Sequence, residues 1–165
     1  METYIGFDTS CYTTSIAIVD GSGEIILDHR SVLRVKEGGR GLRQSEGVFQ
    51  HIKNLGAFAG LKNRLHGEIK IAAAAASVKP RPLPESYMPV FTVGENAARV
   101  AAAVAGVPFF ETTHQENHIM SGLWSAGGPK EERFLTVHLS GGTTELLETV
   151  RNVSGFGVRI VGGTE

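Results

Sequence analysis

The chain has 165 residues and a formal net charge of −1, with 20% charged and 41% hydrophobic residues. These values are typical of a globular protein with a substantial core, and they exclude a disordered or strongly basic chain. Because no general positive charge is present, a polynucleotide partner would need a local basic patch or a second subunit.

The single cysteine, Cys11, cannot form an internal disulfide, and the first residues lead directly into a strand-like run rather than a secretory signal. The candidate apolar run at residues 69–78 is alanine-rich and far shorter than the roughly 20 residues that cross a bilayer. We therefore expect a cytoplasmic protein with no membrane contact.

The chain opens with three strand patterns. Residues 4–8 form a short apolar run, residues 14–19 alternate in polarity, and the turn at residues 20–23 leads into a third run at residues 24–33. These three segments predict an antiparallel meander.

A helical pattern follows a glycine-rich loop, because Val48, Ile52, Leu55 and Ala59 recur on one face up to about residue 65. The next predicted elements are a buried strand at 69–77, a helix at 94–105, a short strand at 107–110 and a helix that carries two histidines. The resulting order, βββαβαβα, predicts an α/β fold with a mixed five-stranded sheet.

The polar segment at residues 127–133 interrupts this pattern. Three further strands are predicted beyond it, at 134–139, 144–150 and 156–161. They repeat the opening meander of the chain.

We therefore divide the chain into a first lobe at residues 1–126, a linker at 127–133 and the incomplete start of a second lobe at 134–165. A three-stranded sheet without covering helices would leave apolar faces in water. This predicts association with a partner protein, or with a second copy of the chain, through residues 134–161.

His114 and His118 are spaced i, i+4 in the segment that follows the apolar run at residues 107–110. On a helix this spacing places both imidazoles on one face, close enough to bind one metal ion. The same spacing also arises on solvated helix faces without function. Its position after a buried strand favours a divalent metal site, since α/β proteins place their chemistry at the carboxyl ends of strands.

Two turns rich in hydroxyl groups occur at matched positions of the two meanders. Such turns expose backbone N–H groups and hydroxyls that can hold phosphate oxygens, although each alone is also compatible with an ordinary hairpin. Asp8 is in addition a candidate to hold a hydrated magnesium ion. The candidate phosphate-binding residues are Asp8, Thr9 and Ser10 in the first turn and Ser140, Gly141, Gly142 and Thr143 in the second.

Several of these motifs together resemble the threonylcarbamoyl-transferase family, TsaD or Gcp and their relatives, formerly called O-sialoglycoprotein endopeptidases. The resemblance spans almost the whole chain and corresponds to an amino-terminal half. It is carried by residues 5–11, 50–51 and 93–94, by the segment 113–118 and by the turn 139–144.

The resemblance implies an actin-like ATPase lobe of RNase H-like topology. It implies that His114 and His118 bind a divalent ion of the iron or zinc type, with an aspartate from the carboxyl-terminal part. It also implies that the turn at 140–143 contacts phosphate of ATP or an acyl adenylate with magnesium. The family reaction transfers a threonylcarbamoyl group to N6 of adenosine 37 in tRNA.

The chain departs from the family pattern at three polar positions, where it has Tyr12, Thr13 and Thr143. The loop at residues 77–89 is also longer than usual and carries four prolines and two cations, which makes it stiff and locally positive. These departures suggest a divergent paralogue. We expect the isolated chain to be inactive and to meet tRNA only through a complex.

Two alternatives to a metal- and nucleotide-binding transferase remain. One is a catalytically silent paralogue that serves as a scaffold in such a complex. The other, weaker alternative is an ATPase similar to sugar or acid kinases, in which the histidine pair would have no evident role.

Overall fold

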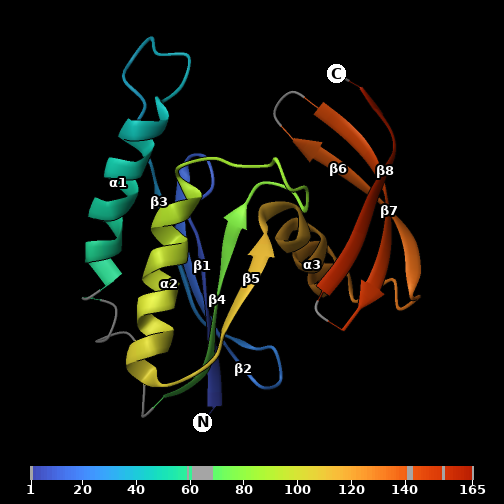
Figure 1. Ribbon diagram of the computed structural model, residues 1–165, viewed down its shortest axis with the longest axis horizontal. Helices are drawn as coiled ribbons and strands as arrows, with labels where there is room; N and C mark the ends of the chain where they lie inside the picture. The colour runs from blue at the N-terminus through green and yellow to red at the C-terminus, as the bar shows by residue number, and fades with distance from the viewer. Residues whose placement is uncertain (1, 59, 61–68, 141–142, 154, 165) are drawn as a thin grey trace.

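The computed structural model describes the whole chain except residues 1, 59, 61–68, 141–142, 154 and 165. The described residues form two β-sheets, with helices packed on the first sheet and one helix between the two (Figure 1). The first sheet contains β1 (Glu2–Asp8), β2 (Thr13–Asp20), β3 (Ile25–Val32), β4 (Lys70–Lys79) and β5 (Phe109–Thr113). The helices are α1 (Gln44–Gly56), α2 (Phe91–Ala105) and α3 (His114–Ala126).

The first sheet has the strand order β3-β2-β1-β4-β5. Strands β1, β2 and β3 pair antiparallel, whereas β4 and β5 run parallel to β1. This arrangement confirms the predicted α/β fold with a mixed five-stranded sheet. Because β1, β4 and β5 are parallel, their carboxyl ends meet at one edge of the sheet.

The core of the first lobe depends on small residues where α2 crosses the sheet. Ala74 and Ala76 of β4 are buried, and so are Ala98 and Ala102 of α2. Alanine side chains let a helix and a strand approach closely, and larger residues fill the remaining space. The larger residues of this cluster are Ile5, Phe7, Ile16, Ile18 and Leu27.

The second sheet contains β6 (Arg133–Ser140), β7 (Thr143–Asn152) and β8 (Gly155–Thr164), paired antiparallel in that order. Helix α3 covers one face of it, where Ile119 and Leu123 pack against Leu147 and Phe156. The predicted meander is therefore present, but the expectation that it lacks a covering helix was wrong for this face. Exposed leucine and valine side chains remain on β6, at Leu135, Val137 and Leu139.

Element boundaries differ from the sequence-based ones in two informative places. Strand β5 runs three residues further than the apolar run, to Thr113, because pairing with β4 continues beyond the apolar residues. Helix α2 begins at Phe91 rather than Gly94, since its first turn packs into the core. The predicted continuation of the first helix to residue 65 lies largely outside the described residues, and described α1 ends at Gly56.

Among the helices of the described residues, none is both long and apolar enough to span a membrane.

Candidate functional site

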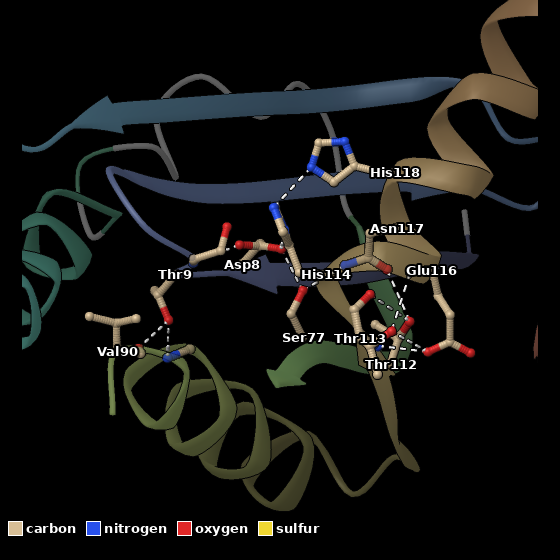
Figure 2. Close-up of polar contacts among 12 residues, drawn as sticks. Asp8, Thr9, Ser77, Val90, Thr112, Thr113, His114, Glu116, Asn117 and His118 are labelled. Atoms are coloured by element: carbon tan, nitrogen blue, oxygen red, sulfur yellow. Dashed lines mark hydrogen bonds and ion pairs between the residues drawn. The ribbon is translucent and has the colours of Figure 1, made fainter. Parts of the chain in front are cut away.

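The site lies at the edge where the parallel strands end. Asp8 is the last residue of β1, Ser77 lies near the end of β4, and His114 is the first residue of α3, directly after β5. Parallel strands of α/β folds place ligand-binding groups at this edge. Figure 2 shows the three side chains meeting there although up to 106 residues separate them in the chain.

Helix α3 begins at His114 because the residues around it form a reciprocal cap. The hydroxyl of Thr113 accepts a hydrogen bond from the Glu116 backbone N–H, and the Glu116 carboxylate accepts one from the Thr113 backbone N–H. Such a capping box fixes the first turn of a helix. It therefore fixes the direction in which His114 leaves the strand.

The carboxylate of Asp8 holds His114 in place. Its Oδ2 lies 3.1 Å from Nδ1 of His114 and accepts a hydrogen bond of 2.5 Å from the Ser77 hydroxyl, while its Oδ1 accepts one of 2.7 Å from the Ser10 N–H. A carboxylate only accepts, so Nδ1 of His114 carries a proton, and in the neutral form of the ring Nε2 is the nitrogen with the lone pair.

The pKa of Asp8 lies well below its ordinary value. Burial alone would raise this pKa, but the hydrogen bond and charge of His114 outweigh the burial, aided by the hydrogen bonds from Ser10 and Ser77. Asp8 is therefore an anion in the folded protein at neutral pH.

His114 and His118 lie on one face of α3, as predicted. Their Nε2 atoms are 2.9 Å apart and their ring centroids 4.3 Å apart, with the rings nearly perpendicular. Burial lowers the pKa of His118, and the nearby His114 and His138 lower it further against the opposing charge of Asp8. A neutral His118 is the form that binds a metal.

The donor set of this pair suits a divalent ion of the iron or zinc type as two of its ligands. The two Nε2 atoms face each other, and Asp8 fixes the ring of His114 from behind. In the described part of the chain, no three or more His, Cys, Asp or Glu side chains are grouped so that they could hold a metal ion.

A second chain of polar contacts supports the same edge. Asn117 donates a hydrogen bond of 2.6 Å to Ser77 and accepts one of 3.0 Å from Thr112 (Figure 2). Ser77 in turn donates to Asp8, so α3, β4 and β1 are linked through side chains. Sequence reasoning missed Ser77 and Asn117, although Asn117 lies inside the histidine motif.

The first hydroxyl-rich turn serves the fold as well as the candidate site. Thr9 is fully buried, and its hydroxyl donates to the Val90 carbonyl at 2.8 Å and accepts from the Gly94 N–H at 3.0 Å. The Ser10 N–H already bonds Asp8. The Thr9 hydroxyl and the Ser10 N–H are therefore already used inside the protein. The predicted contact of this turn with phosphate would depend on other groups.

The second hydroxyl-rich turn lies mostly outside the described residues. Gly141 and Gly142 are not described, and Ser140 and Thr143 are placed only as the backbone pair that closes β6 and β7. The phosphate contacts of this turn remain a prediction.

Glu145 of β7 is a further polar centre that sequence reasoning missed. This buried carboxylate lies 2.8 Å from Arg81, 3.0 Å from the side-chain nitrogen of Gln115 and 3.3 Å from Nδ1 of His138. The three partners come from the loop after β4, from α3 and from β6. No local pattern marks them, because only the tertiary fold brings them together.

One hollow in the described residues lies away from the histidines. Its volume is about 550 Å³, and it is lined at the opposite end of the sheet by Glu2, Lys70–Ala72 and Ala105–Pro108. This hollow is open and contains no histidine. We place the candidate site at the histidines, because the converging polar groups and the lowered pKa values are found there.

Comparison with known proteins finds similar sequences that carry one name. No protein-family model matches the chain. The tRNA N6-adenosine threonylcarbamoyltransferase of Prochlorococcus marinus subsp. pastoris (strain CCMP1986) is 28% identical to it, over 90% of this chain and 42% of the relative. The chain thus spans less than half the length of the curated relatives it matches.

Two solved structures agree on the fold. YeaZ from Pseudomonas aeruginosa superposes with a TM-score of 0.51 at 15% identity, over 98% of this chain and 65% of YeaZ. A transcriptional regulator of the ROK family, a homologue of the E. coli MLC protein, gives 0.56 at 10% identity, over 93% of this chain and 38% of the regulator.

The sequence match and the fold point the same way: over 90% of its length the chain is similar to the amino-acid sequence of a tRNA N6-adenosine threonylcarbamoyltransferase, and it shares its α/β fold with YeaZ.

Proposed function

We propose that this chain binds a divalent metal ion and a nucleotide or acyl adenylate, and that it serves threonylcarbamoyl transfer to N6 of adenosine in tRNA as part of a complex. The observation that carries the proposal is the pair His114 and His118, held at the carboxyl edge of the sheet by Asp8. The match to the transferases supports the reaction class.

In this proposal His114 and His118 hold the ion, which supplies Lewis-acid polarisation of a carbonyl or phosphoryl oxygen. Asp8 keeps Nδ1 of His114 protonated, so that Nε2 remains available as a ligand. Ser77 and Asn117 hold the Asp8 carboxylate and the first turn of α3 in a fixed relation. These residues position the site and keep its tautomers defined.

Phosphate binding is proposed for the two hydroxyl-rich turns, at residues 8–10 and 140–143, with magnesium held through Asp8. Both Asp8 oxygens already accept hydrogen bonds, so a hydrated ion contacted through water fits better than a directly bound one. Replacing Gly141 with valine is expected to abolish nucleotide binding, because a branched side chain blocks close approach of phosphate to the backbone. A variant that binds ATP with magnesium as well as the parent does would contradict this role.

A scaffold function is the second candidate, and one observation favours it. Leu135, Val137 and Leu139 alternate along β6 and are 65%, 62% and 70% exposed. A row of exposed apolar side chains on an edge strand is suited to contact with a partner protein or a second copy of the chain. The proposed contact surface is residues 134–161.

Metal titration tests the site that carries the proposal. Calorimetry with Zn²⁺ is expected to show binding by the parent and greatly weakened binding by His118→Ala. His29→Ala is the matched control, since His29 lies on β3 and contacts Ser31, away from the site. Identical isotherms for the parent and His118→Ala would remove the metal site.

The reaction is tested with tRNA, threonine, bicarbonate, ATP and an adenylate-forming enzyme, followed by mass spectrometry of the nucleosides. The isolated chain is expected to give no product, because its net charge of −1 provides no broad basic face. If product forms only when a partner protein is added, and His114→Ala abolishes it, the transferase role is supported. Partner-dependent product that is unchanged in His114→Ala would favour the scaffold role.

A further inference from the structure

Strand β6 forms an open edge of the second sheet. Within the described residues it pairs with one strand alone, β7, so one side of its backbone has no partner strand. The pairing with β7 runs from Arg133 to Ser140 without a register shift. Residues 134–140 include no proline, no glycine and no lysine, arginine, aspartate or glutamate. A long, regular edge without charges is the kind that accepts another strand.

The other three sheet edges of the described residues are protected against such pairing. Strand β3 carries the exposed ion pair of Asp28 and Arg30, and its pairing with β2 contains a register shift. Strand β5 has only five residues, and its Glu111 pairs with Arg99 of α2. Strand β8 has a register shift against β7 and contains several glycines. Charges, short length, bulges and glycines all discourage pairing between edges, and β6 alone lacks them.

An apolar row follows the open edge. Leu135, Val137 and Leu139 alternate along β6 on the face opposite to the one that α3 covers, where Phe134 packs. These three side chains, the β6 row, are largely exposed. Leu146 of β7 lies opposite Val137 and widens the apolar strip. A contiguous exposed apolar strip marks a surface that contacts another protein.

Charges beside the β6 row decide how a partner can approach it. Glu148 of β7 lies opposite Leu135, and it pairs with Arg133 at 3.5 Å and with Arg159 at 2.6 Å. A partner packed flat on this face would take these charges out of water, which is costly. A strand added in the plane of the sheet leaves them at the surface and pairs the open side of β6. Edge pairing is therefore favoured over face packing.

The sequence of β6 is complementary to itself in antiparallel pairing. With a two-fold axis at Val137, the two copies of Val137 lie opposite each other, and Leu135 of each copy lies opposite Leu139 of the other. The apolar side chains then pair only with one another. A shift by two residues would place Leu139 opposite Arg133 or leave Leu135 outside the strand pair. A shift by one residue would oppose side chains of different faces.

We propose that two copies of this chain pair through β6, antiparallel about a two-fold axis at Val137, so that their three-stranded sheets join into one continuous sheet. The inference rests on the contact surface proposed above for residues 134–161, and it commits that surface to a second copy. It does not depend on binding of metal or nucleotide.

Disulfide cross-linking tests the register on the full chain. Cys11→Ser removes the single cysteine, and Val137→Cys or Leu135→Cys is then added. Opposite residues of an antiparallel pair have Cα atoms about 4.5–5.5 Å apart, which a disulfide can bridge. The two copies of residue 135 lie four residues apart along the strands, or about 14 Å, which is too far.

Oxidation with copper phenanthroline is expected to give a covalent dimer with Val137→Cys and little with Leu135→Cys, the matched control. A mixture of Leu135→Cys and Leu139→Cys proteins is expected to cross-link more than either protein alone. Equal cross-linking of Val137→Cys and Leu135→Cys, or none with Val137→Cys, would overturn the proposed pairing.

Sedimentation and light scattering measure the dimer without a cross-link. The parent is expected to approach twice the chain mass of 17.6 kDa as its concentration rises. Val137→Lys places two like charges opposite each other and is expected to stay monomeric. Val104→Lys is the control, because Val104 is exposed on α2, and it should dimerise like the parent. A monomeric parent, or a dimer that only Val104→Lys dissociates, would overturn the proposal.

Zinc titration of the same proteins separates this inference from the proposed metal site. Val137→Lys is expected to bind Zn²⁺ as the parent does, because the β6 row lies on the face away from α3. A monomeric parent that binds Zn²⁺ would overturn the dimer and leave the metal site in place. A dimeric parent that binds no Zn²⁺ would support the dimer and overturn the metal site.

Discussion

Asp8 has a structural role that its sequence position does not reveal. As the last residue of β1 it was a candidate to hold magnesium beside phosphate, yet in the fold it accepts hydrogen bonds from Ser10 and Ser77 and contacts His114. One carboxylate thereby fixes a turn, a strand end and a helix start. Changes at Asp8 should therefore affect both stability and metal binding.

Asp8→Asn tests this role through acid unfolding. The folded pKa of Asp8 is lowered, so the stability it contributes is present above its unfolded pKa of about 3.9 and is lost as pH falls through the folded pKa. The parent should lose stability steeply below about pH 4, whereas the variant should be less stable at pH 6 and flatter in acid. Urea unfolding at a series of pH values gives the free energy of unfolding of the two proteins. If the free energy falls with pH in parallel for the parent and Asp8→Asn, this role of Asp8 is contradicted.

His51 of α1 gives a second prediction, in a higher pH range. It is fully buried, its Nδ1 lies 2.8 Å from the Thr14 hydroxyl, and burial lowers its pKa despite the opposing effects of the Cys11 backbone and the charge of Asp8. A lowered histidine pKa means that the unfolded chain takes up the proton first as pH falls below about 6.5, so acid destabilises the fold.

His51→Asn should therefore reduce the slope of unfolding free energy against pH between about pH 6.5 and 5. Asparagine can keep the contact with Thr14 but does not titrate. Urea unfolding at several pH values gives this slope, with His29→Asn as the matched control. A slope as steep in His51→Asn as in the control would show that another group causes the acid sensitivity.

The elements of the first lobe were predictable because each has a strong local pattern. The alternating strands at residues 14–19, the apolar run at 69–77 and the alanine-rich helix at 94–105 all correspond to β2, β4 and α2 within a few residues. The errors fall where tertiary pairing extends an element past its apolar residues, as β5 does to Thr113. The mixed five-stranded sheet also followed from the βββαβαβα sequence of elements.

Gly94 is the point where α2 meets the turn after β1. A Cβ at this position would lie 2.9 Å from the Thr9 hydroxyl oxygen, which also accepts the Gly94 N–H hydrogen bond. Gly94→Ala should lower the free energy of unfolding by about 1–3 kcal/mol through overpacking. Gly56→Ala is the matched control, since a Cβ there meets no atom within 4 Å. Equal effects of the two substitutions on thermal unfolding would contradict this packing.

The candidate site was only partly readable from the sequence. The histidine spacing predicted their common face, since a helix repeat is a local property. Ser77, His138 and Glu145 carry no such signal, because they sit in ordinary strand patterns and reach the site only through the arrangement of β4, β6 and β7. Sequence alone therefore identified the pair and not its surroundings.

At the scale of the whole molecule, the loop after β4 is anchored to the second sheet. Arg81 of this loop pairs with the buried Glu145 of β7, and α3 packs between the two sheets (Figure 1). The cations of this proline-rich loop were predicted to make it locally positive. One of them, Arg81, is instead paired with a buried carboxylate.

Arg81→Met tests this anchor. Methionine keeps much of the apolar stem but leaves the Glu145 carboxylate with fewer partners, which should lower the free energy of unfolding by about 1–3 kcal/mol. Arg30→Met is the control, because Arg30 pairs with Asp28 on an exposed strand. Similar urea midpoints for the two variants would show that the ion pair of Arg81 is worth no more than a surface one.

The central claim is a divalent metal centre at the edge where the first sheet meets α3. Crystals of the full chain soaked in Zn²⁺ and measured on both sides of the zinc absorption edge test it most directly. The account predicts one strong anomalous peak within bonding distance of Nε2 of His114 and His118. An anomalous map without a peak there, or with zinc bound only to surface side chains elsewhere, would contradict the account.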